Sequence, residues 1–332
     1  MNQKTDKDYI FLSTRVKAME RTLLTREHIE QMLDAQTDED AVKVLAECGY
    51  PEMNEVTASE LDRVLREQQK KTMADLGSSA PDKNVIDAFR LRWDYHNAKV
   101  LVKSEALESD PEPLLMAGGR YEPQRLAEAY RREDLLFCSD RFRHAIERAR
   151  EILGATGDPQ QSDFVLDRAY FEELAALAKA SESPFLEGYA ALCIDVANLR
   201  SAVRTSRMNR SADFLNQVLV PGGTVSERNV AAARGEELGE LFRTTRLAQA
   251  AAEGAAKSAP GSGALTDFER LCDDAVMGYL SDGRRVPFGV EPIIGYLCAR
   301  ETETMIIRIV MTGRFAGLDR ETIRQRLRRT YV

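Results

Sequence analysis

The chain has 332 residues, of which 43% are hydrophobic and 30% charged, and its net charge is −8. This balance is typical of a soluble globular protein with two or three domains. Duplex nucleic acids are bound mainly through Lys and Arg, so the negative charge argues against a nucleic-acid binder. No run approaches the roughly 18 apolar residues of a membrane helix. The polar start lacks an apolar signal region, so we expect a cytosolic protein that other proteins hold at any membrane.

In chain order, apolar residues recur every three or four positions in most segments, which predicts helices. We expect helices that begin near Asp8, near Arg26, after the N-cap Thr37, and near Thr57 or Ser59, and a long one over residues 84–108. Gly49 and a turn at 77–81 should end two of them. No segment alternates with a period of two, so the sequence predicts no sheet.

A second helical region is expected over residues 113–209, and a third begins near Asp213. Residues 221–224 should break the third region, with Thr224 or Ser226 capping the next helix. A flexible turn is expected at 258–263. The C-terminal arginines are interpreted as the last turns of a helix, where cations suit the helix dipole; they are Arg324, Arg326, Arg328 and Arg329.

One local pattern occurs three times: an acid, two residues, Asn or Ile, one residue, and a base. The copies are Asp94, Asn97 and Lys99; Asp195, Asn198 and Arg200; and Glu303, Ile306 and Arg308. The acids are 101 and 108 residues apart, which is too long for solenoid repeats. We therefore predict an all-α protein of three homologous lobes, over residues 1–110, 111–210 and 211–332. An approximate threefold arrangement would leave a funnel between the lobes.

Asn97 falls in an apolar stripe, and in the third copy the equivalent residue, Ile306, is apolar itself. We therefore expect this position to be buried, with Asn97 and Asn198 bonded to a neighbouring helix terminus. The bases lie off the stripe and could form ion pairs or an interface.

Nothing in the sequence indicates chemistry of the chain's own. Five cysteines form no C-x-x-C pair and three histidines are dispersed, so we expect no disulfide and no metal site. Phosphate-binding loops, nucleophile elbows and zinc-protease motifs are not found. The pairs Gly118-Gly119 and Gly222-Gly223 are interpreted as helix breaks. We predict no catalytic residues and no cofactor.

The chain resembles the C-subunit family of V/A-type ATPases, which is related to the d subunit of the vacuolar ATPase. The likeness rests on the opening segment 9–24, on the first two signature copies, and on the C-terminal runs 287–308 and 317–332. It covers essentially the whole chain, although residues 235–264 match poorly. Ile306 stands where the family's pattern has Asn.

The resemblance implies a non-catalytic central-stalk protein that turns with the rotor. Three helical lobes would form a funnel on the cytoplasmic side of the membrane, seated on the proteolipid ring. The D–F shaft would plug into the funnel, and the protein would link ATP synthesis or hydrolysis to proton or sodium transport. One copy per complex, monomeric when isolated, is implied. Charged residues on the inner faces could touch the shaft, and the candidates are Arg15, Lys99, Arg200 and Arg308.

Three alternatives remain open at this point. The chain could be a helical scaffold or adaptor unrelated to rotary motors. It could be a helical enzyme with an unrecognised site, which would need a deep pocket with perturbed ionisable groups. It could also bind nucleic acid through its arginine-rich C-terminus, despite the overall charge.

Overall fold

The computed structural model describes residues 4–332, and every regular element among them is helical. This confirms the predicted all-α class. No helix within residues 4–332 combines the length and apolar character needed to cross a bilayer. The chain divides into two compact units, each described by itself below.

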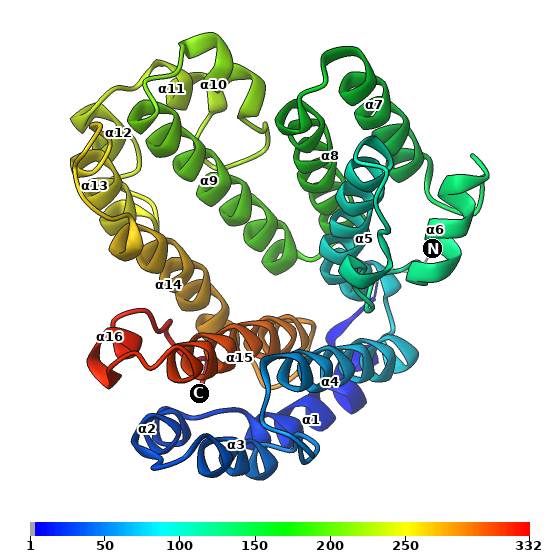
Figure 1. The fold of residues 1–332 in the computed structure, drawn as a ribbon, viewed down its shortest axis with the longest axis vertical. Helices are drawn as coiled ribbons and strands as arrows, with labels where there is room; N and C mark the ends of the chain where they lie inside the picture. The colour runs from blue at the N-terminus through cyan, green and yellow to red at the C-terminus, as the bar shows by residue number, and fades with distance from the viewer. Residues whose placement is uncertain (1–3) are drawn as a thin grey trace. The chain divides into compact units, whose positions relative to one another are not determined.

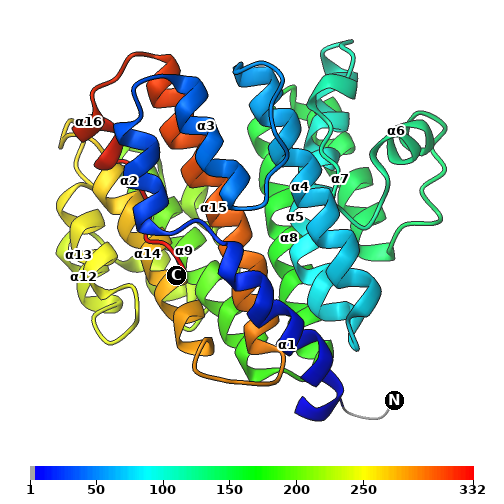
Figure 2. The same ribbon diagram turned by 90° about the horizontal axis from the view of Figure 1, so that it is seen from below.

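The first unit comprises residues 1–81, 242–257 and 262–332, so the two ends of the chain belong to one compact body. Its helices are α1 Ile10–Met19, α2 Arg26–Asp34, α3 Asp38–Glu47, α4 Ala58–Ser79, α13 Ala248–Ala256, α14 Thr266–Gly283, α15 Glu291–Phe315 and α16 Arg320–Arg324. The α15 helix packs against α1, α2, α3, α4 and α14 (Figures 1 and 2).

The second unit comprises residues 82–241 and 258–261. Its helices are α5 Lys83–Ala106, α6 Pro123–Arg131, α7 Asp140–Thr156, α8 Pro159–Ala180, α9 Pro184–Arg207, α10 Ala212–Val218, α11 Glu227–Ala232 and α12 Glu236–Leu241. The α8 helix packs against α5, α7 and α9, and α10 and α11 pack against α9. Short 3-10 turns complete the fold of the chain; they are Asp6–Tyr9, Glu20–Thr22 and Glu112–Leu114.

Local sequence signals start the helices where the sequence analysis places them. The side chains of Thr37 and Ser226 accept hydrogen bonds from the first turns of α3 and α11, which satisfies N–H groups that have no partner inside the helix. Gly49 follows α3 with φ +80°, a conformation that glycine adopts at little cost.

One expectation about helix ends is confirmed and one is wrong. The α4 helix ends at Ser79, inside the predicted turn 77–81, although it continues through Gly77 because a helical glycine weakens a helix without ending it. At the C-terminus the helix ends at Arg324, and Arg326, Arg328 and Arg329 lie in a non-helical tail. The tail's backbone and side chains find tertiary partners on α14, described below.

The core of the first unit draws on both ends of the chain. Ile306, Ile307 and Val310 of α15 share one apolar cluster with α2, α3 and α4. Close packing of such side chains is the main source of helix stability in a folded protein. The α15 helix therefore folds against N-terminal helices that lie about 250 residues earlier in the chain.

Candidate functional site: the repeated helix signature

The three signature copies lie in the long helices α5, α9 and α15, which have 24, 24 and 25 residues. Their acids, Asp94, Asp195 and Glu303, are at most 4% exposed. A buried carboxylate costs free energy unless hydrogen bonds or a cation compensate it. The partners of each acid therefore define what the signature does.

In the first copy, Asp94 binds the end of the loop that leads into the next helix. Its Oδ1 accepts from the backbone N–H groups of Arg120 at 2.9 Å and Tyr121 at 3.3 Å, and its Oδ2 accepts from the Arg120 Nε at 2.7 Å. The Asn97 amide pairs with the backbone of Met116, donating to its carbonyl and accepting from its N–H, each at 2.8 Å. Together they hold the loop 116–121 against α5, just before α6.

The second copy repeats these contacts. Asp195 accepts from the N–H groups of Thr224 and Val225, both at 3.1 Å, and from the Thr224 hydroxyl. Asn198 pairs with both backbone groups of Val220 at 2.8 Å. The loop 220–225 is thereby held against α9, just before α11. In both copies the Asn binds the loop residue that directly follows a helical C-cap, Leu115 after the 3-10 turn Glu112–Leu114 and Leu219 after α10.

The two loops match residue by residue. Met116 and Val220 each lie six positions before the N-cap of the following helix, Glu122 or Ser226. Both loops carry Gly-Gly at the same offset. A Cβ added to Gly119 would come 2.2 Å from the Asp94 Oδ1, and one added to Gly223 would come 2.2 Å from the Asp195 Oδ1.

The glycine pairs are thus part of the signature, where sequence analysis treated them as simple helix breaks. Only a residue without a side chain lets the loop backbone approach the carboxylate so closely. The signal was present in the sequence, because each Gly-Gly pair precedes its N-cap by the same three positions and follows a signature helix.

In the third copy the acid binds the opposite end of the chain. The Glu303 Oε2 accepts from the Leu24 N–H at 2.5 Å, and its Oε1 accepts from the Tyr50 hydroxyl at 2.6 Å and the Arg300 Nη1 at 2.5 Å. Leu24 immediately precedes Thr25, the N-cap of α2. Tyr121 and Val225 hold the same position before their own N-caps. The N-terminal segment therefore supplies the loop that α15 lacks downstream.

The same register explains why Ile306 replaces Asn. Six positions before Thr25 stands Met19, the last residue of α1. Its backbone is helical, and its carbonyl accepts from the Thr22 hydroxyl at 2.9 Å. A helical backbone needs no side-chain amide to satisfy it. Ile306, 1% exposed, instead packs into the apolar core.

Lys99, Arg308 and Arg15 form ion pairs inside their own unit. Lys99 contacts Asp167 at 2.6 Å, and Arg308 contacts Asp62 at 2.9 Å. Arg15 places one Nη nitrogen 2.6 and 2.7 Å from the two oxygens of Asp75. Arg200 is half-buried on α9. Partly exposed pairs of this kind contribute about 1 kcal/mol or less. A contact of these bases with a shaft stays a prediction.

The first copy belongs to a larger buried network. Glu173 on α8 accepts from the Arg120 Nη1 at 2.7 Å, the Tyr95 hydroxyl at 2.8 Å and the Ser139 hydroxyl at 3.0 Å. Burial raises the pKa of Asp94 to about 6, against the opposing effect of the Arg120 guanidinium. Burial also raises the pKa of Asp195, against the opposing effect of its hydrogen bonds from Thr224 and Val225.

These clusters are suited to holding backbone and poorly suited to catalysis. Their carboxylates are buried and already bonded, whereas a general acid or base must reach its substrate. The five cysteines are free thiols. Among residues 4–332, no group of three or more His, Cys, Asp and Glu side chains could hold a metal ion.

Comparison with known proteins now places this architecture. The profile of the family described as ATP synthase (C/AC39) subunit matches residues 12–326. The chain belongs to this family. The resemblance noted from the signature copies is thereby confirmed, and the alternative of a scaffold unrelated to rotary ATPases is ruled out.

Individual relatives align over nearly the full length. The C subunit of the V-type sodium ATPase of Enterococcus hirae is 22% identical, with 98% of this chain and 99% of the relative covered. The C subunit of the V-type ATP synthase of Thermus thermophilus is 26% identical, with 96% and 98% covered. The C subunit of the A-type ATP synthase of Thermococcus kodakarensis is 24% identical, with 96% and 89% covered. The chain is thus a rotary ATPase subunit.

Proposed function

We propose that this protein is the non-catalytic central-stalk coupler of a V/A-type rotary ATPase or ATP synthase. It binds the D–F shaft on one side and the proteolipid ring on the other, at the cytoplasmic face of the membrane. It turns with the rotor, so that ATP synthesis or hydrolysis is linked to proton or sodium transport. The full-length match to C subunits of rotary ATPases is the observation that carries the proposal.

The contacts of the signature support a mechanical role. A coupler that transmits torque must be stiff, and stiffness comes from close packing and from loops tied to helices. Asp94, Asn97, Asp195 and Asn198 tie two loops to two long helices through buried hydrogen bonds. Such ties resist shear because breaking one leaves a buried polar group without a partner.

We further propose that the three lobes are each built around one signature helix and enclose a funnel for the shaft. In this proposal α15 forms its lobe together with α2 and α3. The shared core of these helices and the bond from Leu24 to Glu303 support the grouping. The chain would then close its third lobe by bringing its two ends together.

A pull-down from solubilised membranes of the source cells tests the proposal. The full chain carries an affinity tag, and co-purifying proteins are identified by mass. Recovery of the D and F subunits together with the proteolipid is expected. Recovery of the chain alone, or with soluble proteins outside the motor, would overturn the coupler role.

A matched pair of variants tests the predicted shaft contact of the signature base. Lys99→Gln removes the signature base, and Lys103→Gln removes a neighbouring base that also forms a 2.6 Å ion pair on α5. If Lys99 faces the shaft, only Lys99→Gln lowers the recovery of D and F. Equal recovery with both variants would restrict Lys99 to its ion pair with Asp167.

A further inference from the structure

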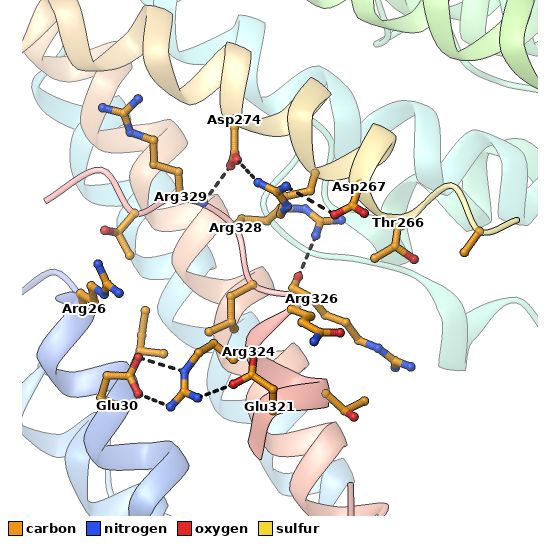
Figure 3. Close-up of a pocket in the computed structure, with 17 residues that line it drawn as sticks. Arg26, Glu30, Thr266, Asp267, Asp274, Glu321, Arg324, Arg326, Arg328 and Arg329 are labelled. Atoms are coloured by element: carbon orange, nitrogen blue, oxygen red, sulfur yellow. Dashed lines mark hydrogen bonds and ion pairs between the residues drawn. The ribbon is translucent and has the colours of Figure 1, made fainter. Parts of the chain in front are cut away.

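A cavity of about 850 Å³ lies in the first unit, away from the signature clusters. It is bounded by the start of α2, the start of α14 and the C-terminal segment from Glu321 to Thr330 (Figure 3). Six arginines and four acidic residues line it. In a chain of net charge −8 this concentration of guanidinium groups needs a physical account.

The arginine-rich tail is held in place. The Arg329 N–H donates to the Asp274 Oδ1 at 2.9 Å, and Arg328 pairs with Asp273 at 2.6 Å. Further on, Tyr331 is 5% exposed, and its carbonyl accepts from the Arg284 Nη1 at 2.8 Å. The tail therefore forms one wall of the cavity with defined positions for its side chains.

Each of the four acids in the wall pairs with an arginine. Arg324 pairs with Glu30 at 2.7 Å and with Glu321 at 2.8 Å. Arg270 pairs with Asp267 at 3.4 Å and with Asp274 at 3.2 Å. Three arginines thus pair with five carboxylates, the Asp273 partner of Arg328 included, and the six arginines of the lining exceed these carboxylates by one.

Three other arginines are left over. Arg26, Arg326 and Arg329 are exposed, and none forms an ion pair with another residue of the described range 4–332. They come from α2, from the turn after α16 and from the tail. Figure 3 shows their side chains apart around the cavity, not converging on one point.

The lining restricts the class of ligand. No aromatic residue lines the cavity, so it offers no stacking surface for a nucleobase. A compact phosphate group would need converging cations, and these three are separated. Carboxylates spaced along a polypeptide match separated arginines, each of which can bind one carboxylate through a pair of hydrogen bonds.

We propose that this cavity docks an acidic segment of a partner protein, whose carboxylates pair with Arg26, Arg326 and Arg329. The proposal does not depend on the coupler role, because it rests only on the charges and contacts of the first unit. In this proposal the arginine-rich tail binds an acidic polypeptide segment, and not nucleic acid.

The test uses the purified full chain and a fluorescent synthetic peptide of four Glu-Asp-Leu repeats, with binding measured by anisotropy. The triple variant Arg26→Gln, Arg326→Gln and Arg329→Gln removes the unpaired charges. The triple variant Arg132→Gln, Arg141→Gln and Arg285→Gln is the matched control, since these exposed arginines carry the same charge and do not line the cavity.

We expect the peptide to bind the natural chain and the control equally. Its binding should weaken as the salt concentration is raised. The cavity variant should bind about tenfold more weakly, because it lacks three exposed pairs. Equal binding by the two variants, or no binding at low salt, would overturn the proposal.

Competition distinguishes the other anions. Inorganic tripolyphosphate and a duplex DNA oligonucleotide are each added to the peptide complex. The proposal would be overturned if tripolyphosphate or DNA displaced the labelled peptide at a lower concentration than unlabelled peptide does, and if the cavity variant, but not the control, lost binding of that competitor. The cavity would then be assigned to phosphate or to nucleic acid. Displacement by unlabelled peptide alone supports it.

Discussion

The first two signature copies and the third solve the same packing problem with different residues. In α5 and α9 an Asp and an Asn hold a glycine-containing loop that follows in the chain. In α15 a Glu binds the N–H of Leu24, some 279 residues earlier, and Ile306 takes the place of the Asn. The acid is kept in all three, while the amide is present only in two.

Each signature position has its own requirement. In all three copies the acid accepts a hydrogen bond from the N–H of the residue just before a helix N-cap. The Asn occurs only where the residue six positions before that N-cap, Met116 or Val220, lies outside a helix. Met19 is helical, and in its copy an apolar residue takes the place of the Asn.

The largest effect is expected from Gly119→Ala or Gly223→Ala. The new Cβ would meet a buried carboxylate oxygen at 2.2 Å, so the loop must move and the acid would lose its N–H partners. We expect the free energy of unfolding, measured by urea titration, to fall by about 3 kcal/mol or more. The control is Gly154→Ala in α7, where a Cβ meets nothing within 4 Å. Similar losses at Gly154 and Gly119 would contradict the close approach.

The next effect is expected from exchanging the amide and the apolar residue. Asn97→Ile leaves both backbone groups of Met116 unpaired, and Ile306→Asn buries an amide that has no loop to bind. Each change should lower the free energy of unfolding by about 2 to 3 kcal/mol. Asn198→Ile should match Asn97→Ile. If Asn97→Ile were tolerated without loss, the loop tie would not be a stabilising contact.

The free energy of unfolding should depend on pH differently in the natural chain and in Asp94→Asn, whose amide does not titrate. The pKa of Asp94 is raised to about 6 by burial, so the native state binds this proton more readily than the unfolded chain does. The stability that Asp94 contributes is therefore fully present below about pH 4 and is lost as the pH rises through about 6. As the pH rises between these values, Asp94→Asn should thus gain about 3 kcal/mol relative to the natural chain. Urea titrations at several pH values measure it, and a slope of opposite sign would contradict the raised pKa.

The smallest effect is expected at the signature bases. Lys99 and Asp167 have side chains 28% and 50% exposed, and Arg308 and Asp62 have side chains 38% and 42% exposed. Lys99→Gln and Arg308→Gln should each lower the free energy of unfolding by about 1 kcal/mol or less. Lys103→Gln gives the matched value for an ion pair outside the signature. If Lys99→Gln alone lowered the free energy of unfolding by more than about 2 kcal/mol, Lys99 would belong with the buried contacts that hold the loop.

Much of the local structure could be predicted from the sequence because its causes are local. Thr37 and Ser226 begin their helices by accepting hydrogen bonds from the first turn, and Gly49 follows α3 in the left-handed region. The buried position of Asn97 and Asn198 also followed, from the apolar stripe around them. The role of the Gly-Gly pairs was missed because it depends on a carboxylate about 25 residues away.

The helical class, most helix starts and the three signature copies can be predicted from the amino-acid sequence, since they depend on residues within a few turns of one another. The partner of each acid, the packing of α15 against the N-terminal helices and the position of the arginine tail are visible only in the folded chain, because the residues involved lie far apart in the sequence. Leu24 and Glu303, or Asp274 and Arg329, meet through packing of the whole first unit, and no local pattern encodes which distant backbone a buried carboxylate will find.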